Sequence, residues 1–186
     1  HTLSLYALKY FESINKKTIN NYKIASTCGD KIYTSLLLKK NNIANLKTFI
    51  AFSAQSARDA ITEIGFPCVI KPPVGSWGRM IAKINDMDAA EAILEHKSFI
   101  PGNNHSIFYI QEYVEKPGRD IRAFAIEETT ICAIYRNSDH WIPNTSRGGN
   151  ATNCQVTGEI QDLNSFGSKS LSPPSRRSTN NWSSNQ

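Results

Sequence analysis

One stretch constrains the fold of this chain more than any other, the segment VIKPPVGSWGR at residues 69–79. It is typical of a short buried strand that ends in Lys71 and runs into a turn, where Gly75 and Gly78 flank two residues. Glycines let the backbone approach a ligand closely and direct N–H groups at an anion. A lysine at the end of the strand would add a positive charge beside these donors. The stretch alone leaves two alternatives open, a phosphate site and an ordinary β-hairpin with a glycine turn.

The composition fits a globular protein but leaves its function open. The 186 residues could form one domain, or one and a fraction. Hydrophobic residues make up 40% of them and aromatic residues 10%, which is enough for a core. The net charge of +5 comes from scattered lysines and arginines, which indicates a solvated surface with some phosphate-binding cations rather than a nucleic-acid-binding stripe. No apolar run approaches membrane-spanning length, and no signal peptide precedes the first expected helix. We therefore expect neither a nucleic-acid partner nor a membrane.

The cysteines indicate a reducing compartment. They stand far apart and form no C-x-x-C pair, so a disulfide framework or a metal site is not expected, and the protein would be cytoplasmic. The chain begins with His1 rather than Met, which would fit a fragment. The four cysteines are Cys28, Cys68, Cys132 and Cys154.

Periodicity and capping residues predict helices and strands along most of the chain. Apolar residues at helical spacing predict a first helix at 3–13, followed by a short strand or extended turn at 18–21. Ser53 and Gly65 are typical of the start and the end of a helix that runs to Ile64. The other expected elements are a helix at 32–40, strands at 47–52, 66–72 and 80–84, a helix from 86 or 88 to 96, a strand at 106–114, and a hairpin of strands 120–126 and 130–136.

Lys31 stands at an unusual place for a cation. Asp30 suits the N-cap position of the helix at 32–40, so Lys31 falls in the first turn. The helix dipole disfavours a positive charge there. An anionic ligand at this helix end would explain the lysine, and so would exposure to solvent, and both alternatives stay open.

Three motifs together resemble a known family. They are Lys71 with the loop GSWGR at 75–79, the run QEYVEKPGRDIR at 111–122, and the segment NTSRGGNA at 144–151. They resemble the RimK-type branch of the ATP-grasp family, and within it the lysine-biosynthesis ligases that join α-aminoadipate to the LysW carrier protein. The resemblance covers about residues 5–158, and the run at 111–122 is its most specific part. It implies an α+β fold in which two α+β subdomains grip ATP.

The resemblance implies an ATP site. Lys31 and Lys71 would contact the phosphates, and the loop at 75–81 would fold over them. The segment 111–114 would be the hinge that reads the adenine edge through its backbone, and a carboxylate would hold the ribose hydroxyls. The expected nucleotide-binding residues are Lys31, Lys71, Gly75, Ser76, Trp77, Gly78, Arg79, Met80, Ile81, Gln111, Glu112, Tyr113, Val114, Glu115, Asp120 and Arg122.

The chemistry of the family makes arginines the expected catalytic residues. ATP would activate a carboxylate as an acyl phosphate, and an amine would attack it to give an amide. Because such a transfer depends on positioning and charge neutralisation, we expect a catalytic pair in which Arg136 contacts the acyl substrate or its phosphate and Arg122 lies nearer the nucleotide. A surface cross-strand ladder is the alternative for these two arginines.

A second glycine pair, at 148–149, would bind the substrate carboxylate. The residues expected to do so are Arg147, Gly148, Gly149, Asn150 and Ala151. A plain loop is the alternative for this segment.

The expected function is therefore ATP-dependent ligation of α-aminoadipate or glutamate to an acidic, LysW-like amino-group carrier protein, in lysine or arginine biosynthesis. The family also implies a homo-oligomer. Three alternatives remain: a RimK-type ligase that adds glutamate to a ribosomal protein or a cofactor, a non-catalytic ATP-binding fragment, and a basic nucleic-acid binder.

The chain departs from the family at both ends. Residues 1–28 would be the remnant of a preceding α/β domain, 29–114 the small subdomain and 115–158 the start of the large one. The family holds Mg²⁺ with an acidic residue and a Glu-x-Asn pair, and nothing after Gly158 supplies them, so the metal ligands would lie beyond a break and the chain would lose most catalysis. Serine, asparagine, proline and arginine dominate from there, so we expect residues 159–186 to be a disordered or frameshifted tail.

Overall fold

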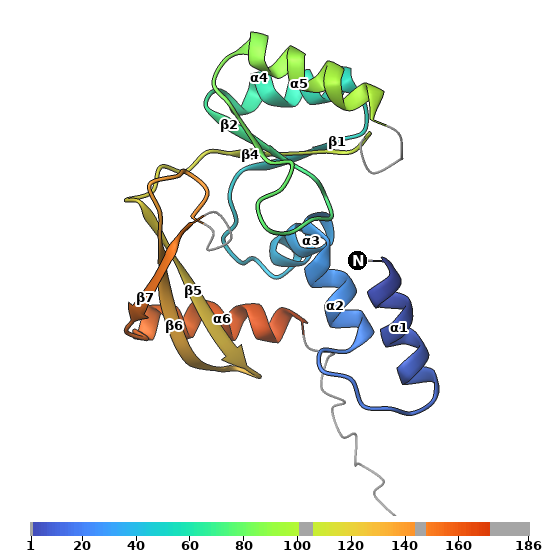
Figure 1. Ribbon diagram of the computed structural model, residues 1–186, viewed down its shortest axis with the longest axis vertical. Coiled ribbons are helices and arrows are strands. Elements are labelled where there is room, and N and C mark those ends of the chain that lie inside the picture. Colours follow the sequence, from blue (N-terminus) through green and yellow to red (C-terminus); the bar gives the residue numbers. More distant parts are fainter. Residues whose placement is uncertain (1, 101–105, 144–147, 172–186) are drawn as a thin grey trace, which may run out of the picture.

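The computed structural model of the protein describes residues 2–100, 106–143 and 148–171 (Figure 1). Over these residues the chain forms two antiparallel sheets with helices packed around them, which confirms the expected α+β class. In chain order the elements are α1 (Thr2–Ser13), α2 (Tyr22–Gly29), α3 (Lys31–Lys40), β1 (Thr48–Ala51), α4 (Ala54–Ile64), β2 (Cys68–Lys71), β3 (Ala82–Ile84), α5 (Met87–Phe99), β4 (Phe108–Glu112), β5 (Arg119–Ile126), β6 (Thr129–Asn137), β7 (Asn150–Cys154) and α6 (Gly158–Leu171).

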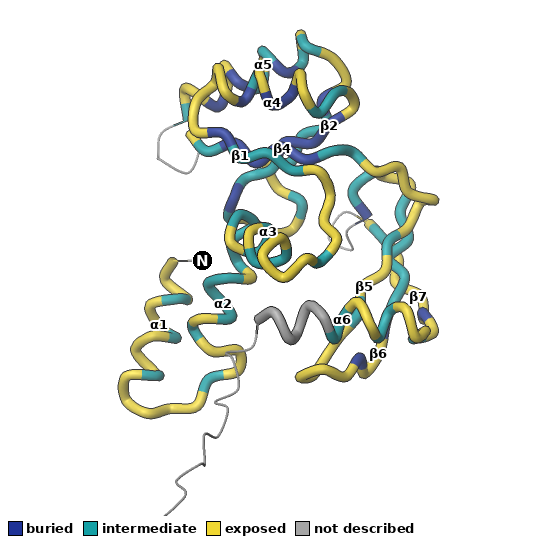
Figure 2. The backbone as a smooth tube through the Cα atoms, turned by 180° about the vertical axis from the view of Figure 1, so that it is seen from behind, coloured by how far each residue is buried: buried dark blue, intermediate teal, exposed yellow. Residues whose placement is uncertain are grey.

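The four-stranded sheet carries the main core. Its strands lie in the order β1-β4-β2-β3, and α4 and α5 cover one face (Figure 1). Because side chains alternate between the faces of a strand, Ile70 and Ile110 point to these helices, while Lys71 and Gln111 point to the opposite face. That opposite face is therefore free to carry polar groups. The buried cluster is Ala51, Ala57, Ala60, Ile61, Cys68, Ile70, Ile84, Ala90, Leu94, Phe108 and Ile110 (dark blue in Figure 2).

Two predicted helix starts are confirmed, and local sequence explains both. The Ser53 side chain caps α4, and Gly65 ends it with a φ of +83°, a conformation that suits a residue without a Cβ. The Asp30 carboxylate accepts the Ile32 N–H at 2.8 Å and caps α3.

The segment before α3 differs from the prediction. The first helix is confirmed as α1, but residues 18–21 form no strand. The Asn21 side chain instead accepts the Ile24 N–H at 2.9 Å and caps α2, which sequence reasoning missed. The missed helix is only eight residues long and contains serine, threonine, cysteine and glycine, which are weak helix formers.

The three-stranded sheet, in the order β5-β6-β7, lies beside the first sheet and packs against α6 (Figure 1). Its first two strands are the predicted hairpin, and Asp120 stands opposite Arg136 in their register. Much of this sheet is exposed (yellow in Figure 2), including Ile126 and Ile131, which are 63% and 57% exposed. The hairpin is therefore confirmed, but it carries far less buried apolar surface than the first sheet.

Residues 159–186 were expected to be a disordered or frameshifted tail, and the disorder is wrong as far as residue 171, because α6 occupies that stretch. The frameshift stays a prediction. Gln161 Nε2 donates to the Glu128 carbonyl at 2.8 Å, and Gln161 Oε1 accepts the Thr130 N–H at 2.9 Å. Asn164 Nδ2 donates to Thr130 Oγ1 at 2.8 Å. These polar contacts fix α6 on the sheet, and a search for apolar periodicity does not reveal them. Residues 172–186 lie outside the described part of the chain.

The cysteines are free thiols: Cys68 and Cys154 are buried, and Cys28 and Cys132 are exposed. Among the described helices, none is both long and apolar enough to cross a membrane.

Candidate functional site

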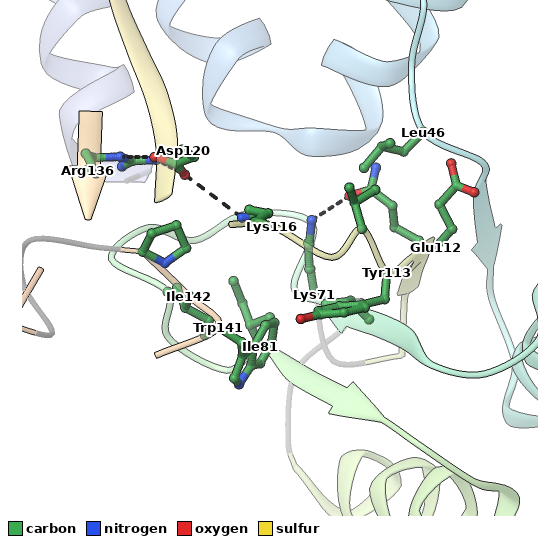
Figure 3. Close-up of a pocket in the computed structure, with 15 residues that line it drawn as sticks. Leu46, Lys71, Ile81, Glu112, Tyr113, Lys116, Asp120, Arg136, Trp141 and Ile142 are labelled. Atoms are coloured by element: carbon green, nitrogen blue, oxygen red, sulfur yellow. Dashed lines mark hydrogen bonds and ion pairs between the residues drawn. The ribbon is translucent and has the colours of Figure 1, made fainter. Parts of the chain in front are cut away.

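A pocket of about 260 Å³ lies where the polar face of the four-stranded sheet meets the first residues of the three-stranded sheet (Figure 3). Figure 3 shows Asp120 and Arg136 on one side and Leu46 and Glu112 on the other. The lining combines apolar side chains with cations, which suits a ligand that has an apolar part and a negative charge. The lining residues are Leu46, Val69, Lys71, Gly78, Ile81, Gln111, Glu112, Tyr113, Val114, Lys116, Asp120, Arg136, Trp141, Ile142 and Pro143.

Lys71 ends β2 and lines this pocket. Its Nζ donates to Gln111 Oε1 at 2.5 Å, and Gln111 Nε2 donates to Thr48 Oγ1 at 3.0 Å. Burial, followed by the charges of Lys31 and Lys116, lowers the pKa of Lys71 to about 8. Because its acceptor is a neutral amide, the positive charge of Lys71 is available to an anionic ligand, which would relieve the repulsion among the three lysines.

Lys31 approaches the same region from the start of α3. Its Nζ donates to the Gly75 carbonyl at 3.0 Å, and its backbone N–H donates to the Pro73 carbonyl at 2.9 Å. Burial lowers the pKa of Lys31, and its charge lowers that of Lys71 in turn. The structure thus brings together two lysines that were selected from separate segments of the sequence.

The loop between β2 and β3 is sharply bent. Trp77, Gly78 and Met80 have φ angles of 65°, 67° and 56°, in the left-handed region that residues other than glycine rarely adopt. Gly78 and Ile81 line the pocket. The other residues predicted in this loop are exposed: Gly75, Ser76, Trp77, Arg79 and Met80. Their contact with a ligand stays a prediction.

The predicted hinge, residues 111–114, lines the pocket along its whole length. Gln111 is only 6% exposed. Glu112 is held by its Oε1, which accepts the Lys47 N–H at 2.7 Å. Lys83 Nζ lies 3.8 Å from the centroid of the Tyr113 ring, within the range of a cation–π contact.

Asp120 and Arg136 form a bidentate ion pair across β5 and β6. The distances from Arg136 Nε to Asp120 Oδ1 and from Arg136 Nη2 to Asp120 Oδ2 are both 2.7 Å, and Lys116 Nζ lies 4.0 Å from Asp120 Oδ2. Both predicted residues line the pocket. Arg122 is exposed and lies outside this lining, so a catalytic pair of Arg136 and Arg122 stays a prediction. Glu115 lines a neighbouring cleft instead.

The described residues of the second glycine segment, 148–151, lie close to Arg136 in sequence register but are not among the residues that line the pocket. Ala151 stands opposite Arg136 in the register of β6 and β7, and Asn150 stands opposite Asn137. Gly148 and Gly149 precede the strand, and Arg147 lies outside the described residues. Substrate binding by this segment therefore stays a prediction.

Sequence reasoning missed several lining residues. Lys116 falls inside the run at 111–122, the most specific part of the resemblance, so its position could have identified it as a pocket residue. Trp141 stands just before the second glycine segment and packs edge-on against Tyr113, with 6.3 Å between the ring centroids. Apolar residues in irregular segments carry no periodic signal, which explains why Leu46, Ile142 and Pro143 were not found.

Over residues 2–100, 106–143 and 148–171, no group of three or more His, Cys, Asp or Glu side chains could hold a metal ion.

The chain is similar to known ligases. It matches the RimK-like ATP-grasp domain family over residues 28–170. It is 38% identical over 164 residues to the alpha-aminoadipate–LysW ligase LysX of Saccharolobus solfataricus, covering 88% of this chain and 60% of that protein. It is 34% identical over 161 residues to the glutamate–LysW ligase ArgX of Sulfurisphaera tokodaii, covering 86% of this chain and 57% of that protein. The chain thus spans between 57% and 60% of the length of these relatives.

A solved structure supports the fold. The RimK domain ATP-grasp protein of Sphaerobacter thermophilus matches with a TM-score of 0.75 and 20% identity, over 90% of this chain and 60% of that one. The family match continues to residue 170, so the resemblance extends past residue 158. Helix α6 fills this stretch and is packed on the sheet like the rest of the domain.

Proposed function

Because this chain belongs to the RimK-like ATP-grasp family, we propose that its pocket binds ATP and that the protein is an ATP-dependent ligase that joins an amino acid to an acidic carrier protein. One observation carries the proposal: Lys31 and Lys71 converge from two elements, and burial lowers the pKa of both lysines. A polyphosphate beside them would favour their charged forms.

The two sheets would then be the start of the two subdomains that grip the nucleotide. We assign residues 29–114 to the small subdomain and the strands β5 to β7 to the large one, and α6 extends that unit past residue 158. Residues 1–28 would belong to a preceding domain. In this division the pocket would lie at the junction, where residues 113–118 lead from β4 of the first sheet to β5 of the second.

Each part of ATP has a matching part of the pocket. Lys71 and Lys31 would hold the phosphates, with N–H groups of the bent loop at 75–81. The backbone of residues 111–114 would bind the adenine edge, against the apolar side chains of Leu46 and Val69. The Asp120 carboxylate would accept hydrogen bonds from the ribose hydroxyls.

The chemistry would be activation of a carboxylate as an acyl phosphate and attack by an amine, which releases phosphate and leaves an amide. The cations at the pocket would neutralise charge that develops on the transferred phosphoryl group. Arg136 would turn from Asp120 toward that group once the ribose occupies Asp120. Bound Mg²⁺ would supply further charge neutralisation. Among the described residues no group of three or more His, Cys, Asp or Glu side chains could hold it, and no step is assigned to it.

The two relatives suggest the substrates. Their names give α-aminoadipate and glutamate as the amino acid and LysW as the partner. Either amino acid, joined to an acidic carrier protein of this kind, would suit a pocket whose lining includes the cations Arg136 and Lys116. Consumption of ATP and free cysteine thiols both suit a cytoplasmic enzyme.

A ligation assay tests this function. The protein is mixed with Mg²⁺, ATP, the acidic carrier protein and either α-aminoadipate or glutamate, and both ADP release and the mass of the carrier are measured. We expect ADP release that depends on the carrier, and a mass gain of one amino-acid residue with only one of the two amino acids. ATP binding without ADP release would instead support a non-catalytic nucleotide-binding protein.

A further inference from the structure

Tyr113 lies between two hollows of the molecule. It lines the ATP pocket and also a neighbouring cleft of about 270 Å³, whose walls include Arg119 and His140. Trp141 lines both hollows as well. These two aromatic side chains therefore form part of the partition between the pocket and the cleft.

The partition is linked to both sheets. Lys83, on β3 of the four-stranded sheet, places its Nζ 3.8 Å from the centroid of the Tyr113 ring. Trp141, which follows β6 of the three-stranded sheet, meets Tyr113 edge-on at 6.3 Å between centroids and an interplanar angle of 63°. Figure 3 shows Tyr113 and Trp141 together at one border of the pocket. The row Lys83–Tyr113–Trp141 thus runs from one sheet to the other beside the pocket.

Hydrogen bonds hold the segment that carries Trp141. The Ser138 N–H donates to the Gly118 carbonyl at 2.9 Å, and the His140 N–H donates to Ser138 Oγ at 3.1 Å. The Ile142 N–H donates to His140 Nδ1 at 3.0 Å. The His140 ring also stacks on Trp141, with 5.9 Å between the ring centroids. Because both neighbours of Trp141 are bonded in this way, the indole is pre-organised in its place.

We propose that Trp141 is a positioning residue for the base of the nucleotide. By packing against Tyr113 it fixes the width of the pocket at the hinge, and Lys83 holds Tyr113 through the cation–π contact. This role rests on the proposed binding of ATP. It concerns the apolar part of the ligand alone, because the predicted phosphate contacts come from Lys31 and Lys71.

The test compares two probes, ATP and inorganic tripolyphosphate, by titration calorimetry. We expect Trp141→Ala to weaken ATP binding about five- to tenfold, as the loss of an aromatic contact predicts, and to leave tripolyphosphate binding within roughly twofold. Trp141→Phe keeps an aromatic edge and should restore ATP affinity to within about threefold of the original. Phe99→Ala is the matched control, since this side chain is 79% exposed and does not line the pocket.

Lys83→Met provides a second arm that is less disturbing to folding. It keeps the apolar stem and removes the charge over Tyr113, so ATP binding should weaken about two- to fivefold while tripolyphosphate binding stays unchanged.

The outcomes separate the two proposals. Equal losses for ATP and tripolyphosphate in Trp141→Ala would mean that the indole supports the fold only, and unchanged ATP binding in both Trp141→Ala and Lys83→Met would overturn its role. A wild-type protein that binds tripolyphosphate but not ATP would refute the proposed function itself.

Discussion

The two sheets of this protein differ in how much apolar surface they bury. The four-stranded sheet buries one face under α4 and α5, and Ile61, Ile84 and Ile110 there are fully buried. In the three-stranded sheet Ile126 and Ile131 are mostly exposed, and polar bonds from Gln161 help to hold α6 on it. Stability thus resides mainly in one sheet, whereas the charged side chains of the pocket come from both.

The difference also affects how firmly each sheet holds the side chains that line the pocket. Lys71 and Gln111 stand on strands whose other face is anchored in the core, so their positions are fixed by packing. Asp120 and Arg136 stand on a sheet with little core, and they hold each other through a bidentate pair. We infer that the first sheet keeps its half of the pocket rigid and that the second adapts to the ligand.

The largest effect should come from a cavity in the core between the four-stranded sheet and its helices. Ile61→Ala removes a fully buried side chain and should lower the free energy of unfolding by about 2–5 kcal/mol. Ile131→Ala, at an exposed position, should change it by less than about 0.5 kcal/mol. Urea denaturation of both variants measures the difference, and similar losses would contradict the assignment of the core to the first sheet.

The ion pair should matter less than the core. A double-mutant cycle of Asp120→Asn and Arg136→Met should give a coupling free energy of roughly 1–3 kcal/mol, because the pair is bidentate and partly buried. The cycle is read from urea denaturation without ligand. Additive effects of the two substitutions would show that the pair does not support the second sheet.

The pH dependence of stability should reveal Lys71. Its pKa lies near 8 in the folded protein, against an ordinary value of 10.5, so between these values the unfolded state binds more protons. Stability should therefore rise with pH above about 8, by at most roughly 1.4 kcal/mol per pH unit from this group, and be independent of it at lower pH. Denaturation midpoints from pH 7 to 10 measure the slope, and Lys71→Met should reduce it. An identical slope in the variant would contradict the burial of this charge.

The smallest effect should come from α6. Gln161→Ala removes two hydrogen bonds to the hairpin and should lower the free energy of unfolding by about 0.5–1.5 kcal/mol. Gln55→Ala, on the exposed side of α4, serves as the control because its bonds to Asp59 and Arg58 lie at the surface. Equal changes in the two variants would mean that α6 adds nothing to the second sheet.

The sequence predicted the elements around the first sheet more completely than those around the second. Apolar patterns identified every strand of the four-stranded sheet, and the cap Ser53 identified the start of α4, because burial of one face leaves a periodic signal. Helix α6 was missed because its anchors, Gln161 and Asn164, are polar. In the pocket, Lys71 was found from its motif, whereas Trp141 depends on a contact with Tyr113 that local sequence does not encode.

Titration of ATP into the wild-type protein and into Lys71→Met tests the central claim most directly, with Lys40→Met as a control that removes an exposed lysine from the end of α3. Because a charge-assisted contact is worth about 1.5–3 kcal/mol, Lys71→Met should weaken ATP binding roughly 10- to 150-fold, and Lys40→Met should leave it nearly unchanged. Equal ATP affinity in all three proteins would contradict a phosphate site at Lys71.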